Sequence, residues 1–445
     1  MNLVILVRAD PIICGHSTEA RNLAEAAISA GIENVHIVSY QLDTLEKSGL
    51  PLKPIESISP YSPGIHIDRP DAVGDYKVLD GRISLGISGH LVDLLHSFDG
   101  DTILMDLYLV PHGFMVMEAV RSFNNSGTSA RAYTIGEAVG SDITNVVGNA
   151  LASGQLGAAQ LVLSNYLAHD LPVAVSQFTK DLIIEAGEQV DQALGTKFAQ
   201  QLEERVQISF PAIDSKSYVD IESNPDEIAA VLEKRHLTHD GYVMFLSRIA
   251  PAKGVDDLLD AWKGCKFRGS KELIICGNGP AKDAIREEAA KLGDVRVLDD
   301  VSDEEKGNLM HACSAWCLPS KPQTEFVETF GIAVAEKMLA GGLGPVITTT
   351  TGGIPEASGG HCLTHTAGDS DSLRACLDQA HDMTDEELAS LSASARKFAL
   401  SFDRVNIFKN LHDQAKAGLK NDNNSPAPIH QISPAISPKG NVIAC

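Results

Sequence analysis

The alternation of short apolar runs with helical periods constrains the fold most, and it occurs twice along the chain. In the first half the apolar runs lie at 3–8, 34–40, 102–110, 130–135, 172–177 and 205–211. After a polar stretch at 212–240, the pattern restarts at 242–248, 272–277, 295–299, 315–320 and 345–350. Strands that alternate with helices form parallel sheets with crossover helices. The sequence therefore predicts an α/β protein with two Rossmann-like domains.

We place the first domain at 1–215 and the second at 216–400. Open parallel sheets bind ligands outside the carboxyl ends of their strands, so two facing sheets would form a ligand cleft between the domains. Residues 392–414 are predicted to form two helices that meet near 401–403. The final segment, 416–445, has four prolines and little periodicity, and we expect it to be a disordered tail.

The charge and the cysteine content indicate which partners the protein can bind and in which cellular compartment it occurs. The 36 Lys and Arg residues against 59 Asp and Glu give a formal charge of −23, and this balance disfavours nucleic acid and anionic membrane surfaces as partners. The first apolar run is broken by Arg8 and Asp10, which makes it too short for a signal segment or a membrane span. Eight scattered cysteines are typical of reduced core residues, and we expect a cytoplasmic protein.

Two strand ends in the second half carry residues suited to a phosphate group. Arg248 and Lys253 follow the strand at 242–248 across a loop, and such a cation pair can hold a diphosphate, since Arg grips two oxygens and Lys adds a mobile charge. Gly277, Asn278 and Gly279 end the next strand, where glycines let backbone amides approach a phosphate or base. The alternative interpretations are solvated surface charges for Arg248 and Lys253, and a tight turn for the glycines.

The stretch "ETFGIAVAEKMLAGG" places Glu328 and Glu336 eight positions apart. Phe330 and Gly331 stand where a helix is predicted to start, and the first amides of a helix favour negative charge. A carboxylate can accept hydrogen bonds from two hydroxyls, which suits a sugar ring or a ribose. Taken singly, each glutamate could equally be a solvated helix residue.

Four consecutive motifs resemble those of one enzyme family. The segments "SRIAPAKGVDDLLDAW", "LIICGNGP", "LPSKPQTEFVETFGIAVAEKMLAGG" and "PVITTTTGGIPE" look like the donor-site motifs of the family-4 retaining glycosyltransferases, which have the GT-B fold. The resemblance covers 241–360. It implies that Arg248 and Lys253 hold the donor diphosphate, and that Glu328 binds the transferred sugar and acts with them in catalysis.

The same resemblance assigns further donor contacts. Glu336 would bind the nucleotide ribose, and backbone amides around Phe330, Gly331 and Ile332 would contact the sugar and phosphate. Cys14-Gly15-His16 stands in the place of the family's N-terminal glycine-rich loop, which makes Gly15 and His16 donor-binding candidates. In this fold the last helix crosses back, so 401–415 is expected to pack on the first domain.

The first domain departs from the family in one motif. Many members have a Thr-x-His segment whose histidine lies against the donor sugar, whereas this chain reads "YTIGEA", with Gly136 at the histidine position and Glu137 after it. His112, which follows the strand at 102–110, and His16 are the candidates to replace it. A histidine at a strand end is more often structural, so the assignment of His112 as catalytic is a hypothesis.

The acceptor side is predicted from the polar segment 60–82, which we expect to be an ordered functional loop because the region around it is rich in proline and glycine but also contains Tyr, His and Arg side chains. The candidate acceptor ligands are Tyr61, His66, Arg69, Tyr76, Lys77 and Glu137. A surface flap is the alternative interpretation of this segment. The chain has no basic amphipathic helix, so membrane association is disfavoured and we expect a small soluble acceptor such as a sugar or sugar phosphate.

The sequence hypothesis is therefore a retaining hexosyltransferase that takes a UDP-, GDP- or ADP-sugar as co-substrate and needs no cofactor. The Asp99-Gly100-Asp101 and Asp369-Ser370-Asp371 matches are interpreted as turn or cap sequences rather than metal ligands. A nucleotide-sugar 2-epimerase, a glycan phosphorylase and a non-catalytic sugar-nucleotide-binding protein stay as alternatives. The oligomeric state is left open.

Overall fold

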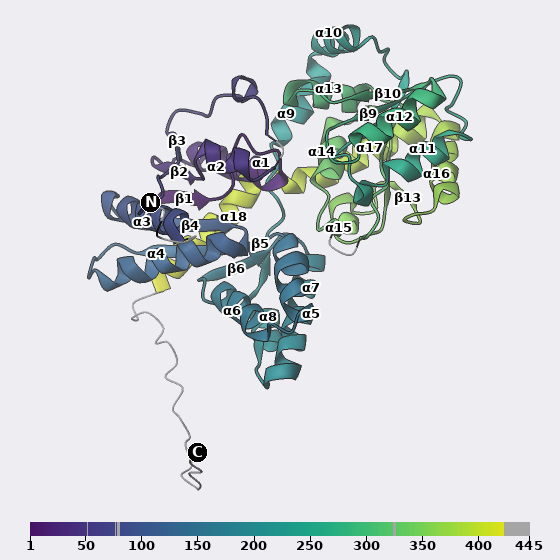
Figure 1. The fold of residues 1–445 in the computed structure, drawn as a ribbon. Helices are drawn as coiled ribbons and strands as arrows, with labels where there is room; N and C mark the ends of the chain where they lie inside the picture. Colours follow the sequence, from purple (N-terminus) through teal and green to yellow (C-terminus); the bar gives the residue numbers. More distant parts are fainter. Residues whose placement is uncertain (51, 76, 78–80, 324–325, 422–445) are drawn as a thin grey trace.

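The computed structural model describes residues 1–50, 52–75, 77, 81–323 and 326–421, and it contains two parallel sheets of seven and six strands. The two sheets belong to separate halves of the chain, and the last helix returns from the second half to the first (Figure 1). The predicted α/β class is confirmed.

The first sheet has the strand order β3-β2-β1-β4-β5-β6-β7. Its strands are β1 (Asn2–Leu6), β2 (Val35–Val38), β3 (Ile65–Asp68), β4 (Thr102–Leu107), β5 (Ala132–Ala138), β6 (Leu171–Ala174) and β7 (Gln207–Ile208). The order of connection reverses between β1 and β4. In sheets of this type, the crevice outside the carboxyl ends of the strands at this reversal is the usual ligand site.

Helices cover both faces of this sheet. They are α1 (Gly15–Ser29), α2 (Leu42–Lys47), α3 (Gly81–Ser97), α4 (Phe114–Asn125), α5 (Gly148–Ala152), α6 (Leu156–Leu167), α7 (Gln177–Leu194) and α8 (Phe198–Arg205), with short turns η1 (Ile55–Ser57), η2 (Leu109–Gly113) and η3 (Asp142–Val147). Ile5 of β1 packs in a core shared with α1, and its neighbour Val4 packs in another core with α3 and α4. This alternation is what a strand buried on both faces requires.

The second sheet repeats the arrangement, in the order β10-β9-β8-β11-β12-β13. Its strands are β8 (Tyr242–Leu246), β9 (Glu272–Cys276), β10 (Val295–Leu298), β11 (Ala315–Leu318), β12 (Val346–Thr349) and β13 (Leu363–His365). The accompanying helices are α9 (Ser215–Val219), α10 (Pro225–Arg235), α11 (Val255–Trp262), α12 (Lys282–Leu292), α13 (Asp303–Ala312), α14 (Ile332–Ala340), α15 (Ile354–Ser358), α16 (Ser370–Asp382) and α17 (Asp385–Ala399), with turns η4 (Asp220–Ser223), η5 (Pro251–Lys253) and η6 (Leu400–Phe402). Here the reversal lies between β8 and β11.

The chain passes between the two halves twice, and the two passages are bonded to each other. Ile213 N donates to Phe402 O over 2.9 Å, and Arg404 N donates to Ile213 O over 2.8 Å. Helix α18 (Arg404–Asn421) then packs against α1 of the first half, as Figure 1 shows in yellow. The helix expected to cross back does so.

Two local expectations were wrong. The polar segment 60–82 contains strand β3, in which Ile65 and Ile67 pack against the α1 core, so this part is the edge of the sheet rather than a loop. Residues 416–421, expected to start the tail, continue α18, because Ala415 and Leu419 are buried on the first domain. The rest of the expected tail lies outside the described residues.

Candidate active site

Lys253 is buried in the loop that follows the carboxyl end of β8. It is the last residue of η5 and is 8% exposed, whereas Arg248 in the same loop is exposed. Gly254, with a φ of 67°, follows, and a Cβ atom there would lie 2.0 Å from Pro319 O in the loop after β11. The loops after the two central strands therefore touch, and only glycine permits this approach.

Glu328 lies directly beside Lys253. Lys253 Nζ donates a hydrogen bond to Glu328 Oε2 and forms an ion pair with it. The ring of Phe326 is 4.8 Å from Lys253 Nζ and 5.9 Å from Arg248 Cζ. Glu328 Oε1 receives no hydrogen bond within the described residues, which leaves this oxygen able to accept one from a ligand hydroxyl. Lys253 thus contacts Glu328 and lies near the Phe326 ring, which Arg248 also approaches.

The N-terminus of α14 follows this group. Gly331 is the N-cap with a φ of 106° and no side chain caps the helix, so the N–H groups of Ile332 and Ala333 have no acceptor among the described residues. Phe330 is buried and packs against Phe210 and Phe402, with ring centroids 5.5 and 5.0 Å away. An anion in front of these amides would be stabilised by the helix dipole.

Glu336 is more enclosed than the sequence suggested. It is 7% exposed, and its Oε1 atom is 3.0 Å from Lys306 Nζ on α13. Lys306 in turn lies 5.7 Å from the Tyr218 ring. Lys306 could not be predicted from the sequence, because its place beside Glu336 arises only from the packing of α13 on α14. Any ligand of Glu336 would also meet this lysine.

Gly277 and Gly279 have a structural reason to be glycines. Their φ angles are 144° and 156°, and Cβ atoms there would lie 2.0 Å from Ser247 O and 2.4 Å from Ile249 O. Asn278 O accepts a hydrogen bond from Ile249 N over 2.9 Å. The glycine loop thus packs against the loop that carries Arg248, and it supports that loop whether or not a nucleotide is bound.

The loop 328–332 was predicted to bind the donor, and we call it the donor-side loop; residues of the first domain hold it by hydrogen bonds and close contacts. Thr329 Oγ1 donates to Val139 O over 2.9 Å, and Ser176 Oγ donates to Thr329 O over 2.6 Å. A Cβ atom on Gly140 would lie 1.9 Å from Thr329 Cγ2, and one on Gly15 would lie 3.1 Å from Ile332 Cδ1. Gly15, predicted from the N-terminal loop, therefore faces the start of α14 directly.

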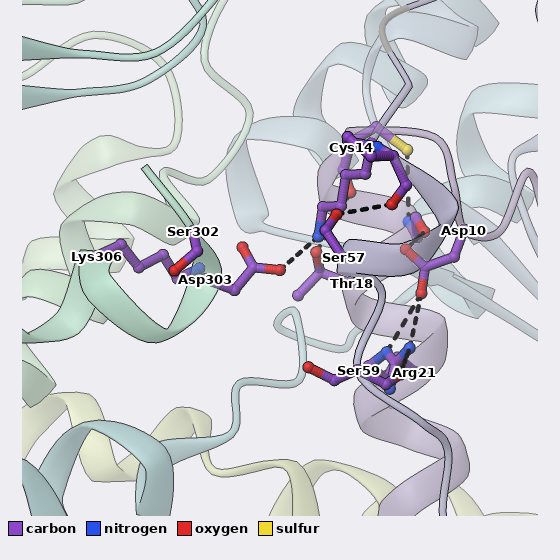
Figure 2. A network of polar contacts seen from close by, with 12 residues as sticks. Asp10, Cys14, Thr18, Arg21, Ser57, Ser59, Ser302, Asp303 and Lys306 are labelled. Atoms are coloured by element: carbon purple, nitrogen blue, oxygen red, sulfur yellow. Dashed lines mark hydrogen bonds and ion pairs between the residues drawn. The ribbon is translucent and has the colours of Figure 1, made fainter. Parts of the chain in front are cut away.

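An ion pair also joins the two domains. Lys53 forms an ion pair with Asp303 at the start of α13. In Figure 2, Asp303 faces the segment of the first domain that carries Cys14 and Thr18. The same view shows Asp10 bonded to Arg21, whose Nη2 atom is 3.0 Å from Asp10 Oδ2.

The structure explains why position 136 is a glycine. A Cβ atom there would lie 2.8 Å from the ring of His169, which fills the space beside β5. His169 Nε2 is 2.8 Å from Asp106 Oδ2, and both side chains are fully buried. Burial opposes charge on this pair, but the Asp106 carboxylate raises the pKa of His169. His169 is structural, and no larger residue could occupy position 136 without moving it.

Of the two candidate histidines, His16 is nearer to the donor loop. It follows Gly15 and is partly exposed, and its ring centroid is 6.0 Å from that of Tyr108. His112 is 1% exposed and neither ring nitrogen has a hydrogen-bond partner within the described residues. Burial, with the charges of Arg8 and His16, lowers the pKa of His112 to about 3. His112 is therefore neutral and lies beneath the surface.

Arg8 is a further candidate site residue, which the sequence analysis did not single out. It lies two positions after β1, at the strand reversal of the first sheet, and its Cζ atom is 5.2 Å from the Tyr108 ring centroid. A charged residue just after the first buried strand was the available signal. It was interpreted only as the end of an apolar run.

Most of the predicted acceptor ligands have other partners. Tyr61 Oη donates to Asp10 Oδ2 over 2.8 Å, and Arg69 Nη1 donates to Tyr40 O over 2.6 Å. His66 stacks on His36 at 4.7 Å. Lys77 lies in the adjoining loop, where its backbone N donates to Asp75, and Tyr76 lies outside the described residues.

Glu137 is buried, with 1% exposure, and cannot reach a ligand in this arrangement. Its carboxyl group faces that of Glu19 on α1, and two carboxyls can hydrogen-bond only by sharing a proton. Burial, reinforced by the charge of Glu19, raises the pKa of Glu137 well above its usual range. Its interpretation as an acceptor ligand is not supported by this position.

Candidate metal clusters and membrane-spanning helices are both absent from the part of the chain that the structure describes. No group of three or more His, Cys, Asp or Glu side chains in that part is arranged to hold a metal ion. Asp369 accepts hydrogen bonds from Asp371 N and Ser372 N, so it caps α16 as the turn interpretation predicted. Among the same residues, no helix has the length and apolar character that a membrane crossing needs.

A protein-family model matches part of the chain. Residues 231–398 match the model of the glycosyl transferases group 1. Among curated proteins, O-antigen chain mannosyltransferase B of Escherichia coli is 27% identical over 201 residues, which are 42% of this chain and 51% of the relative. The 2-deoxystreptamine N-acetyl-D-glucosaminyltransferase of Niallia circulans is 32% identical over 25% of this chain and 28% of its own. The chain thus spans about half the length of the first relative.

Solved structures match nearly the whole chain. HepE of Anabaena, in complex with UDP and glucose, superposes with a TM-score of 0.66 at 17% identity, covering 94% of this chain and 100% of that one. Sucrose-phosphate synthase of Thermosynechococcus elongatus superposes with a TM-score of 0.61 at 16% identity, covering 94% and 100%. These matches confirm the GT-B arrangement of two Rossmann-like domains.

Proposed function

We propose that the protein is a retaining hexosyltransferase that moves a hexose from a nucleoside-diphosphate sugar to a small soluble hydroxylated acceptor, without a metal ion. The observation that carries the proposal is the convergence of Arg248, Lys253 and Glu328 in front of the α14 N-terminus, at the strand reversal of the second sheet. The glycosyltransferase domain match and the transferases among the relatives support it.

In the proposed reaction an acceptor hydroxyl oxygen bonds to the anomeric carbon. The bond from that carbon to the diphosphate oxygen breaks, the electron pair leaves with the nucleoside diphosphate, and a departing phosphate oxygen takes the hydroxyl proton. Attack from the face of departure retains the anomeric configuration. Arg248, Lys253 and the first amides of α14 would stabilise the charge that grows on the diphosphate.

Each glutamate has a separate role in this proposal. Glu328 would use its Oε1 atom to accept a hydrogen bond from a hydroxyl of the transferred sugar, while Lys253 holds Oε2. Glu336 would bind ribose hydroxyls, with Lys306 neutralising its charge in the buried position. Neither contact requires a bound cation. UDP is the nucleotide to test first, because HepE was solved with UDP and glucose. GDP and ADP are the alternatives.

The first experiment measures thermal stabilisation by UDP, GDP and ADP, followed by release of the nucleoside diphosphate from the matching donors. Glu328→Gln keeps the shape of the side chain but weakens its hydrogen bond to the sugar, and we expect a fall in turnover of about 100-fold. Glu386→Gln on exposed α17 is the matched control.

The outcomes separate the hypotheses. Near-normal turnover by Glu328→Gln would contradict the donor-site assignment. Conversion of a nucleotide sugar to its epimer without an acceptor would indicate an epimerase instead. Nucleotide binding without hydrolysis or transfer would indicate a binding protein.

A further inference from the structure

Arg8 is a cation without a counter-ion in a strongly acidic chain. The formal net charge is −23, yet Arg8 makes no hydrogen bond and no ion pair with any residue that the structure describes. It is partly buried, and its contact is with the face of Tyr108 at 5.2 Å. A partly dehydrated guanidinium with five unused donors is well suited to bind an anion.

The sheet register places Arg8 and Tyr108 at the same level. Leu6 of β1 pairs with Asp106 of β4, so the residues two positions later emerge together from the carboxyl end of the strand reversal. Lys253 and Glu328 occupy the corresponding place in the second sheet, after β8 and β11. The chain thus carries one group of polar residues at each of its two usual ligand positions.

Aromatic and histidine rings lie next to the Tyr108 ring that Arg8 contacts. Tyr108 lies 6.0 Å from His16 and 6.3 Å from His112, and His112 lies 5.8 Å from Tyr40. The two ring nitrogens of His112 are buried without partners within the described residues. We call Arg8, His16, Tyr40, Tyr108 and His112 the Arg8 cluster.

The backbone of Tyr108 is strained, and its surroundings maintain the strain. Its φ is 144°, a value that non-glycine residues rarely adopt. Leu109 N donates to Asp142 Oδ2 over 3.2 Å, and Ser141 Oγ donates to Tyr108 Oη over 3.3 Å. Such outliers persist where the surrounding structure fixes them, and they concentrate at ligand sites.

The neighbouring acids do not neutralise Arg8. Asp10 is bonded to Arg21 and to Tyr61, and Asp142 accepts hydrogen bonds from three backbone N–H groups. The Arg8 charge acts on its neighbour: burial and, to a smaller extent, the positive charge of Arg8 together lower the pKa of His16 to about 4. Arg8 therefore has no ion-pair partner among the described residues, and its charge acts on His16.

Arg69 fixes the two loops beside the cluster. Its guanidinium donates to Tyr40 O over 2.6 Å and also to Asp10 O. The loop after β1 is thus tied to the loop after β2, which orders Arg8 before any ligand arrives. Arg69, predicted as an acceptor ligand, is better described as a positioning residue.

The cluster adjoins the donor-side loop. His16 follows Gly15, whose Cβ position lies 3.1 Å from Ile332 at the start of α14. On the other side, Ser141 bonds to Tyr108 and follows Gly140, which contacts Thr329, the residue after Glu328. A molecule bound at the Arg8 cluster would therefore lie next to the sugar that Glu328 is proposed to hold.

We propose that the Arg8 cluster binds an anionic group, a phosphomonoester or a carboxylate, on the acceptor. This inference rests on the proposed function, because it assigns the second substrate of the same reaction. Arg8 supplies paired N–H donors to the anion, and the Tyr40, Tyr108 and His16 side chains are placed to contact the polyol that carries it. The acceptor is then an acidic small molecule, and a neutral sugar lacks the group that Arg8 recognises.

The test measures binding of glucose 6-phosphate, glucuronate and glucose by calorimetry, with UDP saturating the donor site so that no probe can occupy it. We expect at least one anionic probe to bind more tightly than glucose. Arg8→Gln should weaken that binding about 10- to 100-fold, since a hydrogen bond to a charged group is lost. Arg8→Lys should recover part of it, because charge without the planar fork gives one-point contact.

The control and the opposing results keep the two proposals separate. Arg121→Gln, an exposed arginine on α4, should bind the probes as the wild type does. Equal binding of glucose and both anions, or an Arg8→Gln variant within twofold of wild type, would overturn the inference while leaving UDP binding and donor hydrolysis intact. Failure of UDP, GDP and ADP to bind would instead overturn the proposed function. The binding of glucose 6-phosphate and glucuronate can then be measured on the nucleotide-free protein.

Discussion

At the scale of single residues, this protein buries acids in its first domain. Glu19 and Glu137 face each other between α1 and β5, and Glu19 Oε1 also accepts a hydrogen bond from Ala212 N over 3.2 Å in the passage between the domains. Burial raises the pKa of Glu19 to about 7, and the pKa of Glu137 is raised as well. The pair can stay buried only while it holds a proton.

The raised pKa values predict the direction of a pH effect on stability. Unfolded carboxyls ionise near pH 4.5, so between there and the raised values the folded protein binds more protons than the unfolded chain. Stability should therefore fall as the pH rises through about 7, by up to about 1.4 kcal/mol per pH unit for each such group. Glu137→Gln removes one ionisable group, and we expect a flatter profile and higher stability at alkaline pH.

Urea denaturation of the wild type and Glu137→Gln between about pH 5 and pH 8 measures this effect. Glu188→Gln, at an exposed position on α7, should keep the profile of the wild type. Parallel profiles for Glu137→Gln and the wild type would show that the pair does not govern the pH response.

At the scale of elements, the motifs of the second domain could be predicted because each one is local. Lys253 and Gly277 follow their strands within a few residues, so the periodicity that predicts the strand also places the side chain at its carboxyl end. The pattern Ile65-His66-Ile67-Asp68 is also local, with the alternation of a strand. Its proline- and glycine-rich surroundings favoured a loop instead.

The remaining site residues could not be predicted because their partners are distant in sequence. Lys306 meets Glu336 through the packing of two helices, and His169 reaches Gly136 from the turn between α6 and β6, the strand that pairs with β5. No periodicity records such contacts. The absence of a histidine at position 136 was visible in the sequence, but its cause, the ring of His169, was not.

Helix α18 completes the core of the first domain although it follows the second in the chain. Leu411 is buried in the core that contains Ile5 and Leu23, whereas Lys409 on the same helix is exposed. We expect Leu411→Ala to lower the free energy of unfolding by about 2–4 kcal/mol, since it leaves a cavity between α18 and the sheet. Lys409→Ala should change it by less than about 0.5 kcal/mol.

Chemical denaturation of the two variants measures this difference. Unfolding is followed by far-UV circular dichroism rather than by tryptophan fluorescence, because both tryptophans, Trp262 and Trp316, lie in the other domain. A loss for Leu411→Ala no larger than that for Lys409→Ala would mean that α18 is not part of the folded first domain in solution.

At the scale of the whole molecule, one carboxylate of the second domain caps a helix of the first. Glu356 on α15 accepts hydrogen bonds from Gln177 N over 2.7 Å and from Phe178 N over 2.9 Å, at the start of α7. Ser176, the N-cap of that helix, donates to Thr329 O in the donor-side loop. Domain closure therefore supplies the α7 N-terminus with an acceptor and fixes the backbone next to Glu328.

Glu356 is only partly buried, so its hydrogen bonds to the N-terminus of α7 contribute a small free energy. A contact of this size can control how fully the two domains close. A carboxylate at a helix N-terminus contributes about 1–2 kcal/mol, so its loss should reduce the ratio of closed to open molecules by about 5- to 30-fold. We predict that Glu356→Ala in the presence of UDP has a larger radius of gyration by small-angle scattering than the wild type. A larger share of donor turnover should end in hydrolysis, because water enters a site that closes less fully.

Glu386→Ala, on an exposed turn of α17 in the same domain, removes a similar charge without touching α7 and should match the wild type in both measurements. The decisive comparison is between hydrolysis and transfer within one variant. If Glu356→Ala lost both in equal proportion at an unchanged radius of gyration, the carboxylate would act on the chemistry or on folding rather than on closure. If the radius grew and hydrolysis rose while nucleotide affinity stayed within about twofold, the contact between α15 and α7 would be the part of the fold that holds the domains together during transfer.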